Sequence, residues 1–186
     1  SGSGSSTLSF TYTVADGDSS NDLDYASTSA LVLNSGTIKD AAGKAASLTL
    51  ASPGATNSLG ANKALIIDTT VPTMAITATD GTSTVSSGST TNDVSLTVTF
   101  TSSETTTNFA SSDITVSGGT LGTLSGSGSI YTATFTPSAD GATTIDVAAS
   151  TFTDAAGNNN TAATQYAWTY DSTAPAASLA YTISSS

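Results

Sequence analysis

The segment Val-Ser-Leu-Thr-Val-Thr-Phe, residues 94–100, alternates apolar and polar side chains without interruption. Successive side chains of an extended strand point to opposite faces of a sheet, so this pattern predicts a strand with one buried face. The same alternation occurs over residues 8–14, 131–135 and 166–170, and we expect each of them to form a half-buried strand. No segment shows the period of an amphipathic helix, so the sequence predicts an all-β chain.

Turn sequences separate the expected strands. Asp-Gly occurs at residues 80–81 and 140–141, and Ser-Gly-Gly occurs at residues 117–119. Asp and Gly favour turns because Asp bonds to its own backbone and Gly accepts positive φ. Short strands at this spacing, with no helical segment between them, predict a β-sandwich or a barrel.

The composition excludes several classes of function. The chain has 186 residues with 3 Lys or Arg, 14 Asp or Glu, no Cys and no His. A Cys nucleophile, a Ser-His-Asp triad, a disulfide and a Cys/His zinc site are therefore impossible. A net charge of −11 argues against nucleic acid, because phosphate binding needs clustered cations. No apolar run reaches the roughly 18 residues of a membrane span. We expect no enzymatic activity, no nucleic-acid partner and no membrane insertion.

An internal repeat organises the chain. Three short motifs each occur twice, and the two sets follow the same order. The motifs are Ala-Asp-Gly at residues 15–17 and 139–141, Asp-Ala-Ala-Gly at 40–43 and 154–157, and Asp-Thr-Thr-Val-Pro at 68–72, which returns as Asp-Ser-Thr-Ala-Pro at 171–175.

The two copies differ in what precedes their first motif. Residues 73–138 precede it in the second copy, but only residues 1–14 precede it in the first. We expect three parts, namely an incomplete repeat with C-terminal strands only, a complete repeat, and a final strand. These parts cover residues 1–70, 71–173 and 174–186. The final strand begins a further repeat or is donated to a neighbouring copy, so the chain is either a window of a longer array or a strand-exchanging subunit.

The spaced pattern of Phe-Thr-Tyr-Thr-Val, Asp-Gly-Asp, Asp-Ala-Ala-Gly and Asp-Thr-Thr-Val-Pro resembles bacterial immunoglobulin-like repeats. These repeats build giant cell-surface adhesins and other extracellular proteins. The resemblance implies immunoglobulin-like β-sandwich repeats in tandem, at a bacterial surface. The first copy departs from the pattern at Lys44, where the repeats usually have Asn. For the second copy, the implied strands lie near residues 74–78, 94–100, 114–116, 121–124, 130–135, 144–148 and 163–170, with Trp168 in the core.

The topology implied by this resemblance gathers acidic residues at the domain junctions. Carboxylates that converge repel one another unless a cation lies among them, and calcium takes about six to eight oxygen ligands. We therefore expect calcium at the junctions, although an Asp in such a loop can equally serve its own turn. The expected ligands are Asp16, Asp18, Asp68, Glu104, Asp154 and Asn158 at the first junction, and Asp80, Asp140 and Asp171 at the second.

The leading interpretation is a structural and adhesive extracellular protein that forms a rigid stalk or filament, stiffened by calcium. Its partners are then neighbouring repeats or copies of itself. The alternative is a module whose loops bind a surface glycan or a protein receptor. Aromatic candidates for that alternative are Tyr25, Phe109 and Tyr181, each of which we also expect in a core.

Overall fold

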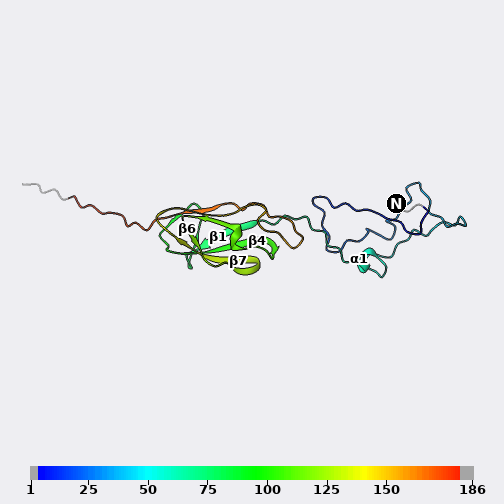
Figure 1. Cartoon of the computed structure of the whole chain (residues 1–186), viewed down its shortest axis with the longest axis horizontal. Helices are drawn as coiled ribbons and strands as arrows, with labels where there is room; N and C mark the ends of the chain where they lie inside the picture. The colour runs from blue at the N-terminus through cyan, green and yellow to red at the C-terminus, as the bar shows by residue number, and fades with distance from the viewer. Residues whose placement is uncertain (1–3, 181–186) are drawn as a thin grey trace, which may run out of the picture. The chain divides into compact units, whose positions relative to one another are not determined.

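The chain divides into two compact units, which we call unit 1 (Ser1–Thr70) and unit 2 (Val71–Ser186). The structure is a computed structural model, and it describes residues 4–180. The labelled strands all belong to unit 2, whereas the label α1 marks a short helix in unit 1 (Figure 1).

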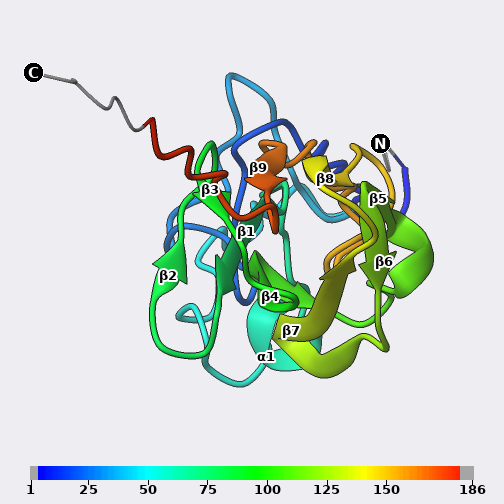
Figure 2. The same cartoon turned by 90° about the vertical axis from the view of Figure 1, so that its left-hand side faces the viewer.

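Unit 2 is a sandwich of two sheets, which Figure 2 shows as separate layers. Neighbouring strands are antiparallel throughout, except for a short parallel pair between β3 and β9. The five-stranded sheet consists, in spatial order, of β2 (Thr84–Val85), β1 (Met74–Thr79), β4 (Leu96–Thr106), β7 (Ser125–Pro137) and β6 (Gly119–Leu121). The four-stranded sheet consists of β3 (Thr90–Thr91), β9 (Tyr166–Tyr170), β8 (Gly141–Val147) and β5 (Ile114–Ser117), and a 3-10 turn, η1 (Ser111–Asp113), precedes β5. This architecture confirms the prediction of an all-β sandwich.

The register of β4 against β7 explains where the core lies. Leu96 pairs with Phe135, and Phe100 pairs with Tyr131, so apolar side chains meet on one face of the sheet. All four side chains are buried, because the opposite sheet covers this face. Trp168 on β9 is only 2% exposed, which confirms its predicted place in the core. Other members of this core are Met74, Val98, Ile145, Val147, Phe152 and Tyr166.

Several predicted strand boundaries need correction. The strand expected over residues 94–100 begins at Leu96, because Val94 is 72% exposed, and it continues to Thr106. The strand expected near residues 121–124 is β6, which ends at Leu121. Strands β2 and β3 were not predicted, because two residues each are too few to show an alternating pattern.

Unit 1 lacks the strand that its sequence predicts. Residues 8–14 were expected to form a strand with a buried face, but the structure assigns no strand there. Phe10 is 76% exposed, and Leu8, Tyr12 and Val14 are exposed as well. A strand forms only where neighbouring strands bond to its backbone, and among the described residues none pairs with this segment in a ladder. The prediction was therefore wrong for this segment.

Unit 1 is held instead by turns and a few long-range hydrogen bonds. Ser20 and Ile67 exchange backbone N–H···O bonds of 2.9 and 2.8 Å, and Leu23 donates to the carbonyl of Leu65 at 2.8 Å. Helix α1 (Leu59–Asn62) is a single turn, whose N-terminus is capped by the buried Ser58. A helix of this length carries no periodicity, which is why the sequence did not reveal it.

Candidate functional site

The chain enters unit 2 at a point fixed by hydrogen bonds to two of its segments. The carbonyl of Pro72 accepts a hydrogen bond of 3.0 Å from the N–H of Thr161. The N–H of Thr73 donates to the hydroxyl of Ser103, and the Thr73 carbonyl accepts from the N–H of Ser103, both at 2.9 Å. Pro72 is fully buried. The entry point therefore lies beside the end of β4 and the loop that follows β8.

Two acids of unit 2 face each other at this entry point. Glu104 follows Ser103 on β4, and Asp154 forms an isolated β-bridge with Thr106 of the same strand. A carboxylate oxygen of Glu104 lies within 4.8 Å of a carboxylate oxygen of Asp154. Asp154 is only 6% exposed, so water screens this pair poorly. A cation between the two acids would lower their mutual repulsion.

A tight turn holds the carboxylate of Asp154. Its Oδ1 accepts hydrogen bonds from the N–H groups of Gly157 at 2.7 Å and Asn158 at 2.9 Å. Its Oδ2 accepts a further bond of 2.9 Å from Nδ2 of Asn158. Burial raises the pKa of Asp154, but the hydrogen bonds from Asn158, Gly157 and Ala156 outweigh burial and hold that pKa below its ordinary value. The group is therefore ionised at neutral pH, as a calcium ligand must be.

Two residues that sequence reasoning missed support this turn. The Oδ1 of Asn160 accepts from the N–H groups of Thr151 at 2.8 Å and Phe152 at 2.9 Å, and its Nδ2 donates to the carbonyls of Ala148 and Thr161. Phe152 is buried and packs edge-on against Phe109, with ring centroids 5.2 Å apart. In the sequence, Asn160 looks like any loop residue, whereas an isolated Phe beside a turn was a usable signal.

Asp68 and Asp171 occupy equivalent turns. Oδ1 of Asp68 accepts a bond of 2.9 Å from the N–H of Thr70, and Oδ1 of Asp171 accepts a bond of 2.9 Å from the N–H of Thr173. Asp68 belongs to unit 1 and lies three residues before Val71, with which unit 2 begins. Each Asp thus closes its own turn.

Asp80 and Asp140 are also engaged in local hydrogen bonds. Asp80 accepts bonds from the N–H groups of Ser83 and Thr82 and from the Thr82 hydroxyl, and these bonds lower its pKa. Asp140 accepts bonds from the Thr173 and Ser172 hydroxyls and from the Ser172 N–H, which lower its pKa likewise. Among residues 4–180, these two acids and Asp171 form no group of three converging carboxylates. Calcium binding at this set stays a prediction.

The acids near the start of unit 1 are exposed. Oδ2 of Asp18 accepts a bond of 2.7 Å from the Tyr12 hydroxyl and one of 2.8 Å from the N–H of Ala15, and these bonds lower the pKa of Asp18. Asp16 lies on the same turn. In the part of the chain that the structure describes, neither acid belongs to a three-acid group.

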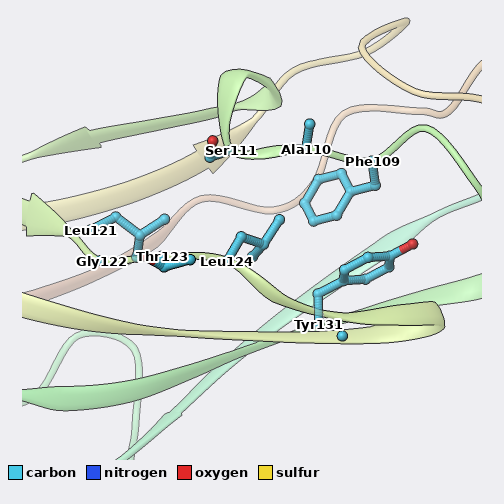
Figure 3. Close-up of a pocket in the computed structure, with 9 residues that line it drawn as sticks. Phe109, Ala110, Ser111, Leu121, Gly122, Thr123, Leu124 and Tyr131 are labelled. Carbon is cyan, nitrogen blue, oxygen red and sulfur yellow. The ribbon is translucent and has the colours of Figure 1, made fainter.

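A pocket of about 500 Å³ opens in unit 2 between η1 and the turn that joins β6 to β7 (Figure 3). Phe109, Leu121, Leu124 and Tyr131 form its apolar walls. The rings of Phe109 and Tyr131 meet edge to face with centroids 5.1 Å apart, and both are buried, so Phe109 lies in the core as expected. A glycan platform needs an exposed ring face, which these two rings do not offer.

Tyr25 and Tyr181 are the other two aromatic candidates for a glycan or receptor surface. Tyr25 is half-buried in unit 1, where its hydroxyl donates a bond of 2.7 Å to the carbonyl of Ala51. Tyr181 lies outside the described residues.

The turn at Asp154 has a counterpart in unit 1. The N–H of Asp40 donates to the carbonyl of Lys44 at 3.0 Å, as Asp154 donates to Asn158 at 3.2 Å. Ala46 donates to Ile38 at 3.0 Å, as Asn160 donates to Phe152 at 3.0 Å, and the β-bridges Lys39–Ala45 and Thr153–Asn159 correspond as well. The turns differ at the residue four positions after the Asp, because Lys44 offers Asp40 its backbone N–H but no side-chain amide. They differ also at the Gly, since the N–H of Gly43 donates to the backbone carbonyl of Asp40 and that of Gly157 to Oδ1 of Asp154.

Comparison with known families identifies a family that the sequence of unit 2 resembles. Residues 68–170, more than half of the chain, match the sequence model of a family described as a bacterial Ig-like domain. The matched span contains all nine strands that the structure describes within residues 4–180. No curated protein and no solved structure matches the chain. Over residues 4–180, no helix has both the length and the apolar character needed to cross a membrane.

Proposed function

Because the chain belongs to the bacterial immunoglobulin-like domain family, we propose that it is a structural repeat of a rigid stalk or filament at a bacterial surface. Domains of this family are typically non-enzymatic and commonly extracellular. In this proposal the chain contacts neighbouring repeats or copies of itself, and adhesion is the purpose of the assembly.

The observation that carries this proposal is the recurrence of the same connections in both units. The hydrogen bonds of the turn at residues 40–44 return at residues 154–158. The turn at Asp68 returns at Asp171, directly after β9. Repetition of connecting elements is what a tandem array of similar domains requires, because each repeat must leave its neighbour in the same way.

We place calcium at the junction between the two units. Its proposed ligands are Glu104, Asp154 and Asp68. Asp68 lies four residues before Pro72, and four extended residues span at most about 14 Å, so the linker allows Asp68 to reach the entry point of unit 2. A divalent ion there offsets the repulsion between the acids and removes freedom from the linker. Further oxygen ligands in this proposal are Asn158, Asp16 and Asp18, with Asp80, Asp140 and Asp171 serving the next junction.

Small-angle scattering and thermal melting of the whole chain, with calcium and with chelator, test this proposal. We expect calcium to lengthen the particle and to raise the melting temperature. Glu104→Ala with Asp154→Ala should abolish both effects, whereas Asp146→Ala, which removes an acid from the side of β8, should preserve them. If neither quantity responds to calcium, the chain is a calcium-independent spacer.

The pocket beside η1 favours a second function, in which unit 2 binds a receptor. Its apolar walls, together with Ser111 and Thr123, which also line it, suit a small side chain of a protein partner. A glycan array and a pull-down from surface extracts address this alternative. Saturable binding that Leu124→Asp removes would support it, and its absence would leave the stalk role alone.

A further inference from the structure

Residues 8–14 of unit 1 form an apolar segment that has no neighbouring strand. Within the described part of the chain, the backbone of residues 10–14 donates and accepts no hydrogen bond with other backbone groups. The apolar side chains that alternate along the segment are between 43% and 76% exposed, namely those of Leu8, Phe10, Tyr12 and Val14. An unpaired apolar segment of this kind is a template for pairing with another strand.

Unit 1 also has open space beside this segment. Two cavities of about 340 and 300 Å³ are both lined by Phe10 and Leu31. The larger one has mostly apolar walls, which include Leu50 and Leu59. A strand that pairs with residues 8–14 can therefore bury apolar surface that unit 1 itself leaves exposed.

The charges around the segment favour one direction for the pairing of two identical copies. Residues 8–14 carry no charge, whereas Asp16 and Asp18 follow them closely. A parallel pairing in register would place these acids beside the same acids of the second copy, and like charges that face each other are unfavourable. An antiparallel pairing separates the two acidic turns by the length of the segment, about 20 Å. This distance exceeds the Debye length of about 8 Å at physiological salt.

The segment is complementary to itself when two copies are paired antiparallel about Thr11. The pairs across the twofold axis are then Leu8 with Val14, Phe10 with Tyr12, Ser9 with Thr13, and Thr11 with itself. Apolar side chains meet on one face and hydroxyl side chains meet on the other, and both kinds of pair stabilise antiparallel sheets. A register shifted by one residue would place apolar side chains opposite hydroxyl ones. The sequence of the segment therefore selects a single register.

We propose that residues 8–14 of two copies of this chain pair antiparallel about Thr11 and form a twofold-symmetric dimer. The same surface serves both copies, as a twofold interface requires. The dimer supplies the strand partner that the monomer lacks, and it buries Phe10. It specifies one contact between copies in the proposed function and rests on that function in this respect, although the pairing itself requires no calcium.

The area of this contact indicates a weak dimer. An aromatic side chain buries about 150–250 Å². The exposed fractions of Phe10 and Tyr12, 76% and 56%, then correspond to about 200–330 Å² in each copy. Stable interfaces bury about 800 Å² per partner and reach micromolar affinity or better. We therefore expect a dissociation constant on the order of 100 µM, so the monomer prevails in dilute solution.

Analytical ultracentrifugation of the whole chain in chelator tests whether this dimer forms. At concentrations from well below to well above the expected dissociation constant, the mass should rise from one copy to two. Phe10→Asp should weaken the association by about tenfold or more, because it places a charge on the apolar face. The matched control is Ile66→Asp. It adds the same charge at another apolar side chain of unit 1, which is 71% exposed, and should leave the association unchanged.

Cysteine cross-linking tests the register, because the chain contains no native cysteine. Residues directly opposite in an antiparallel pair have Cα atoms about 4.5–5.5 Å apart, within the range of a disulfide. Thr11→Cys should therefore form a disulfide-linked dimer under mild oxidation. Thr13→Cys should not, because its counterpart lies about 13 Å further along the strand. A mixture of Ser9→Cys and Thr13→Cys chains should cross-link again, as non-reducing electrophoresis can show.

Three results would overturn the proposal. A mass of one copy at every concentration would show that the segment binds no second copy. An equal loss of association in Phe10→Asp and Ile66→Asp would place the contact elsewhere. Cross-linking of Thr13→Cys alone, to the same extent as Thr11→Cys, would show a parallel or non-specific pairing. Because calcium is absent throughout, these results are independent of whether calcium stiffens the proposed stalk.

Discussion

At the scale of single residues, Asp154 combines a structural and a charged role. Its carboxylate accepts hydrogen bonds from Gly157 and Asn158 while Glu104 lies beside it. The turn therefore stabilises the ionised form that a cation requires. Because the same bonds maintain the loop, the role of Asp154 in the turn and its proposed role at a cation site need separate measurements.

We predict that unit 2 loses stability in acid through Asp154, in the absence of calcium. Its folded pKa lies below that of the unfolded chain, about 3.9. Its contribution is therefore complete above that value and is lost as the pH falls through the folded pKa. Asp154→Ala should lower the free energy of unfolding by about 2 kcal/mol at pH 7. It should also flatten the pH dependence between about pH 5 and about pH 2. Denaturant unfolding across this range measures both effects.

The matched control is Asp146→Ala. Asp146 lies on β8 and accepts one hydrogen bond from the Gln165 side chain near the surface. We expect a cost of about 0.5 kcal/mol or less at pH 7. An equal loss in both variants would contradict the assignment of the acid sensitivity to Asp154.

Trp168 is a second residue whose contribution to stability can be tested, because its ring packs in the core while one of its polar atoms is unsatisfied. Its ring packs against Phe135 with centroids 4.8 Å apart, but within the described residues its buried Nε1 has no hydrogen-bond partner. Trp168→Phe removes this unsatisfied group along with some volume, so we expect a loss of only about 1 kcal/mol. Trp168→Ala should cost about 3–5 kcal/mol. Chemical unfolding monitored by circular dichroism compares the two, and equal losses would contradict the argument.

At the scale of elements, the link from β5 to β6 carries the chain from one sheet to the other. Gly118 has φ +74°, and a Cβ at this position would lie 2.3 Å from the carbonyl oxygen of Ala142. A Cβ on Gly119 would lie 2.5 Å from the Phe135 ring. Only glycine therefore fits at these two positions of the link between the sheets.

We predict that Gly119→Ala destabilises unit 2 by about 2–4 kcal/mol, because Phe135 lies in the centre of the core and cannot move away. Gly122→Ala is the control. Its Cβ would meet the Thr134 carbonyl at 3.3 Å, which a small shift relieves, so we expect a much smaller loss. Thermal melting of both variants measures the two losses. Similar melting temperatures would contradict the argument that the link from β5 to β6 cannot accommodate a Cβ at residue 119.

The elements also show what the sequence could and could not predict. Alternation identified β4, β7 and β9 because their partners lie within the chain. The same rule failed for residues 8–14, because the pattern records which face a strand would bury and not whether a partner is present. At the candidate site, topology implied by a family resemblance pointed to Glu104 and Asp154. Asn160 could not be found this way, because the hydrogen bonds of its side chain depend on a loop path that spacing does not encode.

At the scale of the whole molecule, apolar burial is distributed unevenly. Unit 2 contains every buried member of the hydrophobic core among the described residues, and in unit 1 Ser58 and Gly60 are the buried ones. Stability follows apolar area removed from water, so the two units should not unfold together.

We therefore predict a two-stage loss of structure in the chain as it stands. Amides of unit 1 should exchange at rates close to those of an unfolded chain, whereas the amides of β4, β7 and β8 should open only with global unfolding of unit 2. Hydrogen exchange followed by mass spectrometry distinguishes the stages. Uniform protection across residues 4–180 would contradict this picture.

The parallel pair β3–β9 has a mechanical consequence. Thr169 donates to the carbonyl of Ser89, and Asp171 donates to that of Thr91, so the last strand is clamped to a segment near the beginning of unit 2. Tension applied through the two ends of unit 2 pulls β9 along its own axis, across these hydrogen bonds rather than along them. The bonds then bear the load simultaneously and must shear as a set, whereas a hairpin pulled from its open end would unzip one bond at a time. Under such a load, the resistance of unit 2 to unfolding would therefore depend on the direction of pull.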